Sequence, residues 1–169
     1  MKTTTLGQFW YGFNISALIL SVFLILFVPL VQGFQDFTKT VDIMLKGDLT
    51  QTGIYTIEIA NASSTPLNAI EFELFYNPLE VTITNIVAHS VLCEERFIIT
   101  NHIDNKEGQA LFQCGTIIPY TNATGTIATI HTKRNVSAIP PLTFGTTTHV
   151  LAHDGYGTDA TRNLFVSMQ

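Results

Sequence analysis

The stretch that decides the fold is Leu67-Asn68-Ala69-Ile70-Glu71-Phe72-Glu73-Leu74-Phe75-Tyr76-Asn77-Pro78, because apolar side chains recur there at every second position. The apolar set is Ile70, Phe72, Leu74 and Tyr76, and the residues between them are Glu71, Glu73 and Phe75. Successive side chains of a β-strand point to opposite faces of a sheet, whereas a helix would scatter this set around its circumference. The pattern therefore predicts a half-buried strand. It ends at Asn77-Pro78, since proline supplies no ladder donor and disfavours helix in its predecessor.

Segments with the same period of two continue on both sides of this strand. We expect strands at 38–45, 53–61, 70–76, 81–87, 96–101, 109–116, 125–133, 142–153 (bent or split) and 161–167. Pieces rich in Gly, Asn, Asp and Pro separate them and are typical of turns. Because the strands are short and no amphipathic helix follows residue 37, the sequence predicts an all-β fold. Its architecture is an antiparallel β-sandwich of the jelly-roll type with about nine strands.

The N-terminal segment has a different composition, since residues 3–35 contain no Asp, Glu, Lys or Arg. As a helix, 13–34 would extend about 33 Å, which matches a hydrocarbon core of roughly 30 Å. We expect one hydrophobic helix at 13–34, either a transmembrane anchor or a cleaved signal peptide, after a short segment at 1–12. The β-domain would then occupy 35–169. It would lie outside the cell membrane, as part of a single-pass protein or as a secreted domain.

Two cysteines, Cys93 and Cys114, lie in the β-domain, and the chain has no others. An even pair in an exported domain predicts one disulfide, and two buried free thiols are the alternative. Three Asn-x-Ser/Thr sequences, at Asn61, Asn122 and Asn135, would accept glycans only if the host modifies such sites.

Composition and motifs exclude several functional classes. The formal charge is −5 and the eight Lys and Arg residues are scattered singly, so no basic stripe is available to nucleic acid. The closest histidines, His149 and His153, would lie about 13 Å apart on one strand, too far to share a metal ion. Residues 154–159 lack the ligand spacing of an EF-hand and are interpreted as a glycine-rich hairpin. We expect no catalytic residues, no metal, no cofactor and no enzyme activity.

Two motifs resemble the cohesin family of bacterial and archaeal surface proteins. They are LNAIEFELFYNPLEV at 67–81 and GTIATIHTK at 125–133. In that family an aromatic-x-aromatic strand runs into Tyr-Asp-Pro or Tyr-Asn-Pro and then Leu-Glu-Val, and a Gly-x-Leu/Ile-Ala-x-Ile strand follows later. The resemblance covers roughly residues 42–165. It implies a jelly roll that recognises a protein module, dockerin in the best-known cases, through the outward face of one sheet.

The resemblance also indicates which residues would contact the partner. In the family, the strand before Tyr-Asn-Pro presents two polar residues two apart, frequently Asn and then Asp, and Ala69 and Glu71 occupy these positions here. Glu71 keeps the acceptor chemistry, whereas Ala69 departs from a standard dockerin contact. We expect a partner-binding face with Glu71, Glu73 and Phe75, in which Phe75 is an exposed aromatic anchor. In the alternative interpretation the two glutamates are merely solvated and Phe75 lies under a loop.

These observations favour an extracytoplasmic protein-binding module, a cohesin-like adhesion or scaffold domain with a dockerin-like partner. One alternative is a carbohydrate-binding module that binds polysaccharide. Because 35–169 contain no Trp, its sugar platforms would have to be Tyr55, Tyr76, Tyr120 or Tyr156. Another alternative is a minor pilin-like filament subunit, although the glutamate expected near the start of such a helix is missing.

Overall fold

The computed structural model describes residues 39–47, 53–89, 92–93, 95–135 and 141–168. The hydrophobic helix predicted at 13–34 and the short segment at 1–12 lie outside these residues. Within the described residues, no helix has the length and hydrophobicity needed to cross a membrane.

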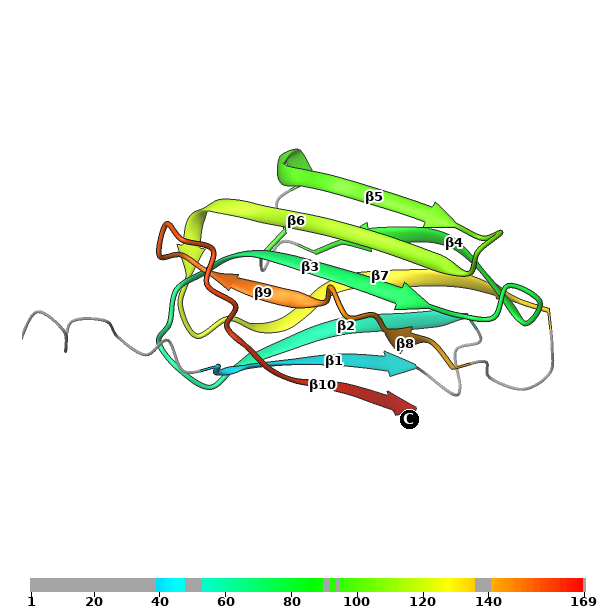
Figure 1. Cartoon of the computed structure of the whole chain (residues 1–169), viewed down its shortest axis with the longest axis horizontal. Coiled ribbons are helices and arrows are strands. Elements are labelled where there is room, and N and C mark those ends of the chain that lie inside the picture. Colours follow the sequence, from blue (N-terminus) through cyan, green and yellow to red (C-terminus); the bar gives the residue numbers. More distant parts are fainter. Residues whose placement is uncertain (1–38, 48–52, 90–91, 94, 136–140, 169) are drawn as a thin grey trace, which may run out of the picture. The chain divides into compact units, whose positions relative to one another are not determined.

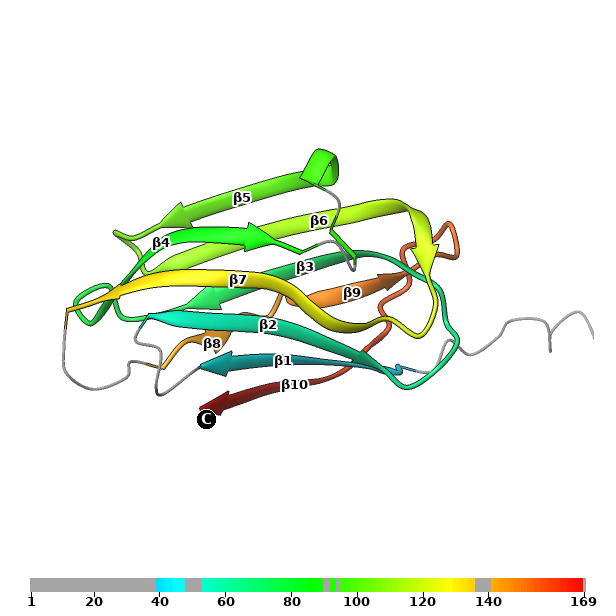
Figure 2. The same ribbon diagram turned by 180° about the vertical axis from the view of Figure 1, so that it is seen from behind.

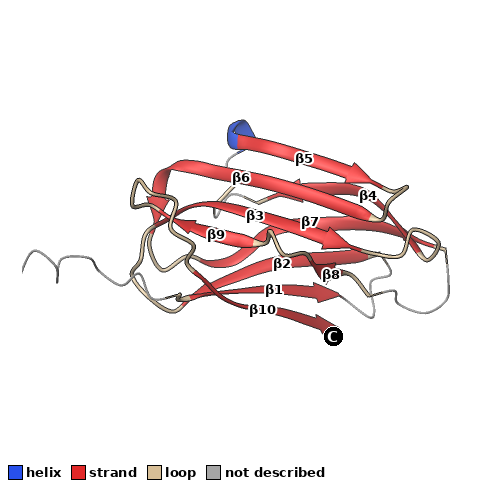
Figure 3. Ribbon diagram, in the orientation of Figure 1, coloured by secondary structure: helices blue, strands red, loops and turns tan. Residues whose placement is uncertain are grey.

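Two β-sheets pack face to face in the described part of the chain, which confirms the predicted all-β sandwich (Figures 1 and 3). The first sheet, in the order β10-β1-β2-β7-β4, contains β1 (Val41–Gly47), β2 (Ile54–Asn61), β4 (Val81–Ala88), β7 (Thr124–Arg134) and β10 (Thr161–Met168). The second, in the order β5-β6-β3-β8 with β9 also paired to β3, contains β3 (Leu67–Phe75), β5 (Ile98–Asp104), β6 (Gln109–Tyr120), β8 (Thr143–Phe144) and β9 (His149–Ala152). Seen from behind, β7 and β2 lie in front of β3 and β9 (Figure 2).

One strand pair departs from the predicted antiparallel arrangement. β10 runs parallel to β1, with Ile43 beside Leu164 and Leu45 beside Val166. At the start of this pair, Asp42 accepts hydrogen bonds from Arg162 and Asn163, and the bond from Arg162 lowers the pKa of the Asp42 carboxyl. The alternation of inward and outward residues is the same in parallel and antiparallel strands, so the sequence pattern could not reveal this direction.

The predicted strand at 142–153 is split into β8 and β9, which pair with different parts of β3. β8 lies beside Leu74 and Phe75, whereas β9 runs beside Leu67 to Glu71. The predicted strand at 96–101 also differs, because a short 3-10 turn, Glu95–Phe97, comes before β5.

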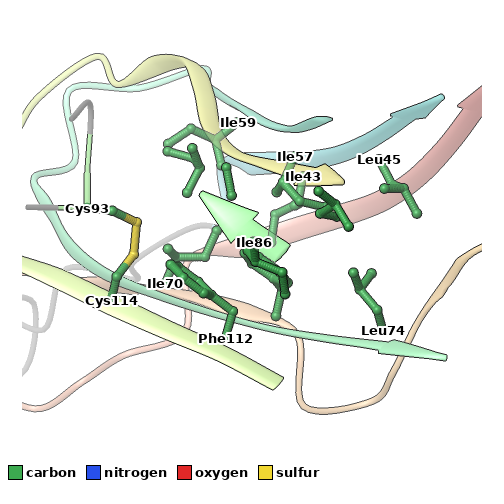
Figure 4. Packing of buried hydrophobic residues seen from close by; sticks show 14 of the residues in the cluster. Ile43, Leu45, Ile57, Ile59, Ile70, Leu74, Ile86, Cys93, Phe112 and Cys114 are labelled. Carbon is green, nitrogen blue, oxygen red and sulfur yellow. A yellow bond between two sulfur atoms is a disulfide. The ribbon is translucent and has the colours of Figure 1, made fainter. Parts of the chain in front are cut away.

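The core lies between the sheets and is made by the alternate residues that the sequence marked as apolar. In β1, β2 and β3 the buried side chains recur at every second position over most of each strand. Phe72 and Phe112 stack at the centre with ring centroids 5.0 Å apart. Other fully buried side chains are Ile43, Leu45, Ile57, Ile59, Ile70 and Leu74 (Figure 4). Ile83 and Ile127 are buried as completely.

The structure contains the predicted disulfide between Cys93 and Cys114. It joins the connection after β4 to the inner face of β6, with the two Cα atoms 5.2 Å apart (Figure 4). Its cysteines are 21 residues apart in the sequence, and closing a loop of this size stabilises the fold by about 3 kcal/mol.

Asn105, in the turn between β5 and β6, joins the two sheets at one edge. Its Oδ1 accepts hydrogen bonds from the Ile83 N–H and the Tyr76 hydroxyl, both at 2.9 Å, and its Nδ2 donates to the Ile83 carbonyl at 2.9 Å. Burial, assisted by the charge of Asp104, raises the pKa of Tyr76, so its hydroxyl stays a donor. One side chain thus supplies partners to the backbone of an edge strand and to a buried phenol.

We predict that Asn105→Ala lowers the free energy of unfolding by about 2 kcal/mol, because the two backbone groups of Ile83 lose their partner in a partly buried place. The Tyr76 hydroxyl keeps longer contacts, at 3.4 and 3.5 Å, to the carbonyls of Asp104 and Gln109. Urea denaturation of the full chain would measure this loss. Asn85→Ala, which removes the same amide from an exposed position on β4, should change stability by less than about 0.5 kcal/mol. Equal denaturation midpoints for the two variants would show that the Asn105 contacts contribute nothing.

Candidate functional site

The outer side of the second sheet, here called the β3 face, brings together residues from β3, β5, β6 and β9. It consists of the residues that alternate with the core positions: Ala69, Glu71, Glu73, Phe75, Thr100, His102, Gln109, Leu111, Gln113, His149 and Leu151. The ladder pairs Glu71 with Gln113 on one side and with His149 on the other. Two of the predicted site residues, Glu71 and Phe75, have side chains that solvent reaches.

A row of polar side chains crosses the β3 face from β5 to β9. Thr100 Oγ1 donates to Gln113 Oε1 at 2.7 Å, and Gln113 Nε2 donates to Glu71 Oε2 at 2.6 Å. His149 Nε2 lies 3.8 Å from the same Glu71 oxygen. Among the described residues, the contacts of Gln113 and His149 with Glu71 both fall on Oε2, so Glu71 Oε1 remains as an acceptor. The Glu71 carboxylate is therefore held in place before any partner arrives.

Glu73 occupies the same side of β3 but has a different environment. Only 8% of it is exposed, because the connection between β8 and β9 covers it. Gln109 Nε2 donates to Glu73 Oε1, and Thr147 Oγ1 donates to Oε2. Little of this carboxylate is left for an external group.

Phe75 is the last residue of β3 and lies between Gln109 and Thr143 in the ladder. It is 42% exposed. A large aromatic side chain on an open sheet face offers substantial contact area at a small conformational cost. It therefore has the exposure that a binding anchor needs.

Sequence reasoning missed several residues of this face. Thr100, Gln113 and His149 were not predicted as site residues, although Gln113 and His149 flank Glu71 and Thr100 bonds to Gln113. It also placed the end of the β6 strand at residue 116, whereas Ile117 and Ile118 continue it and are 66% and 71% exposed. Because successive side chains of a strand point to opposite faces of the sheet, two adjacent isoleucines cannot both face the core. The pair Ile117-Ile118 was therefore a signal in the sequence that a strand continuing through it exposes an apolar side chain.

No constellation for metal binding occurs in the described ranges, where no three His, Cys, Asp or Glu side chains lie together as ligands would. His149 approaches Glu71, while His153 Nδ1 lies 3.2 Å from the side-chain nitrogen of Asn68.

The loop at 154–159 uses its acidic side chain for its own geometry. Asp154 Oδ1 accepts hydrogen bonds from the backbone N–H groups of Tyr156 and Gly157. A bond from the Thr158 side chain, followed by the one from the Tyr156 N–H, lowers the pKa of Asp154.

This loop connects β9 of the second sheet to β10 of the first, with an isolated antiparallel bridge between Leu151 and Asp159 at its base. The predicted hairpin between the last two strands is therefore wrong, because β9 pairs with β3 and β10 pairs with β1.

Burial separates the residues proposed for the alternative functions. Tyr55 and Tyr76 are 2% and 7% exposed, so neither can serve as a sugar platform, whereas Tyr120 and Tyr156 reach the surface. Asn61 is also buried, and its Nδ2 donates to the Thr65 carbonyl, so this Asn-x-Ser sequence is structural.

Comparison with known proteins places this sandwich in a class. No protein-family model and no curated protein matches the sequence. Solved structures do match, among them a cohesin of ScaC from Acetivibrio cellulolyticus, in complex with the ScaB dockerin, with 16% identity and a TM-score of 0.63 over 76% of this chain and 97% of that chain. The OlpC and OlpA cohesins from Clostridium thermocellum, each in a type I cohesin–dockerin complex, match 77% of this chain and 95% and 99% of theirs, with 11% and 15% identity and TM-scores of 0.59 and 0.60.

The described domain is thus a two-sheet β-sandwich that exposes one sheet face with a fixed carboxylate and an aromatic side chain. More particularly, it is a cohesin-like domain in its fold.

Proposed function

We propose that this domain is a non-catalytic protein-binding module that captures a dockerin-like protein through the β3 face. The observation that carries the proposal is the row Thr100–Gln113–Glu71–His149, which fixes one carboxylate beside an open sheet surface. The fold supports the same conclusion, because structurally similar cohesins occur in complexes with dockerins.

The physical basis of capture is preorganisation. A free glutamate loses rotamer entropy when a partner binds it, whereas Glu71 is already held by Gln113. Its remaining oxygen can accept a charge-assisted hydrogen bond from a hydroxyl, amide or ammonium group of the partner. Phe75 adds apolar contact area at the end of the same strand.

Ala69 stands where cohesins frequently have a polar residue, so polar recognition by this strand would depend on Glu71. The Ala69 side chain has no hydrogen-bonding group, and Ala69 lies beside Gly115 in the ladder. Leu151 on β9 pairs with Ala69 on the other side. This end of the β3 face is therefore apolar, and a matching partner would place an aliphatic side chain there and a donor at Glu71.

We also propose that the domain works outside the cytoplasm, tethered by residues 13–34 or released by their cleavage. The disulfide between Cys93 and Cys114 supports an oxidising compartment. The uncharged composition of residues 3–35 supports membrane insertion or export.

The proposal is tested by capture followed by mapping. The immobilised full chain is exposed to secreted and surface proteins of the source organism, a retained protein is purified, and amide hydrogen exchange locates its footprint. We expect protection on β3, β6 and β9. Protection confined to β1, β2 and β7, or retention of insoluble polysaccharide and of no protein, would overturn the proposed function.

For Glu71→Gln, we predict at least a tenfold weaker affinity for the captured protein, since a charge-assisted bond contributes about 1.5–3 kcal/mol. Isothermal titration calorimetry would measure it. Glu58→Gln is the matched control, because Glu58 lies on the opposite sheet, pairs with Lys46, and has a side chain 25% exposed against 21% for Glu71. The same loss of affinity in both variants would contradict recognition by Glu71.

Phe75→Ala should weaken the same complex by about 1–2 kcal/mol, because it removes an exposed aromatic from the interface. Phe165→Ala on β10 is the control, since Phe165 is 48% exposed against 42% for Phe75 and belongs to the other sheet. Both variants should keep their thermal midpoints within a few degrees of the parent chain. If Phe75→Ala binds as tightly as the parent, Phe75 lies outside the interface.

A further inference from the structure

Two glutamates on one side of β3 differ in what surrounds them. Glu71 keeps an accessible carboxylate, with 21% of its side chain exposed. Glu73, two residues further along, is 8% exposed and lies beneath the connection between β8 and β9. An external partner could reach the first without rearrangement of the domain, and could hardly reach the second.

Glu73 is hydrogen-bonded to residues 145–148, which connect β8 to β9. Its Oε2 accepts from Thr147 Oγ1 at 3.1 Å, and its carbonyl accepts from the Gly145 N–H at 2.8 Å. Thr148 Oγ1 lies 3.1 Å from the Glu73 nitrogen and 3.3 Å from its carbonyl oxygen. On the other side, Gln109 Nε2 donates to Oε1, so the carboxylate links β6, β3 and the connection.

Gly145 provides the space for this arrangement. A Cβ at this position would lie 2.1 Å from Glu73 Oε2, so the carboxylate occupies the place where any other residue would carry its side chain. Any other residue at this position would force the Glu73 side chain to move, so the observed place of the carboxylate depends on the glycine.

Glu73 also lies where the sheet ladder is interrupted. β8 pairs with Leu74 and Phe75, and β9 pairs with Glu71 and the residues before it. Between the two pairings, the Glu73 carbonyl accepts from the Gly145 N–H and the Glu73 N–H donates to the Thr148 hydroxyl, which takes the place of a backbone acceptor. The Glu73 carboxylate adds a side-chain bond from Thr147.

From these contacts we infer that Glu73 is a positioning residue, whose carboxylate fastens residues 145–148 to β3 and so fixes both ends of the β8–β9 edge. The edge in turn places His149 beside Glu71 and Thr143 beside Phe75. The attachment of residues 145–148 to β3 is inferred from the hydrogen bonds of Glu73 and does not depend on any partner. Its consequence for partner binding rests on the proposed function. Of the two carboxylates, Glu71 contacts the partner and Glu73 holds the border of the surface.

The test is amide hydrogen exchange of the full chain without any partner. In Glu73→Ala, exchange at the Gly145 and Thr148 amides should accelerate about tenfold or more relative to amides of β2 and β7. Local opening of the connection is then easier, because it no longer has to break the contact with the carboxylate. Thr147→Val removes the hydrogen bond between the connection and the Glu73 carboxylate, and should accelerate exchange at the same amides by no more than Glu73→Ala does, because the carboxylate still packs against Gly145. Glu73→Gln, which keeps one acceptor oxygen, should restore part of the protection.

A second readout follows the position of His149. Its ring signals in NMR spectra should shift in Glu73→Ala, while those of His131 on the first sheet should not. Glu71→Gln is the matched control and should leave exchange at Gly145 and Thr148 unchanged.

Unchanged exchange at these amides in Glu73→Ala and Thr147→Val, or equal acceleration in both sheets, would overturn the inference. Because no partner takes part, that failure leaves the proposed function untouched. Conversely, a partner footprint confined to β1, β2 and β7 would remove the proposed function and leave the fastening by Glu73 in place.

Discussion

The dry layer between the two sheets is the constraint on which every other feature depends. Phe72 and Phe112 stack there, and the neighbouring positions on each strand are closed to water. Because side chains alternate strictly along a strand, burying Ile70 and Phe72 forces Glu71 to the outside. A register slip of one residue would bury both glutamates and expose the core, so the core fixes the outer face as firmly as it fixes the inner one.

The outer face uses cross-strand neighbours to turn ordinary polar residues into a defined surface. Thr100, Gln113, Glu71 and His149 come from four different strands, and each contacts the next. No member alone would be distinctive, since a solvated glutamate can adopt many rotamers. The row restricts those rotamers before a partner binds, which lowers the entropic cost of recognition.

The two sheets treat their edges on one side of the sandwich in different ways. In the first sheet, β10 joins β1 in parallel, and Asp42 accepts from Arg162 at the start of the pair. In the second sheet, the edge strand breaks into β8 and β9, and Glu73 contacts the connection between them. A short, interrupted edge also offers few free backbone groups to other chains, which limits unwanted pairing.

The sequence by itself determined the features that depend on near neighbours along the chain. Alternation at 70–76 predicted β3 and its two faces, the cysteine pair predicted the disulfide, and the turn residues separated the strands. The N-terminal helix and the location of the domain stay predictions. The tertiary structure alone decided that β10 is parallel to β1, that Tyr55 is buried, and that Gln113 and His149 flank Glu71. It also decided that Glu73 is covered by a segment more than seventy residues away. The physical reason is that periodicity is a property of a single strand. The direction of a strand, its register and the segments that cover its side chains depend on which distant strands pack together to bury apolar surface away from water.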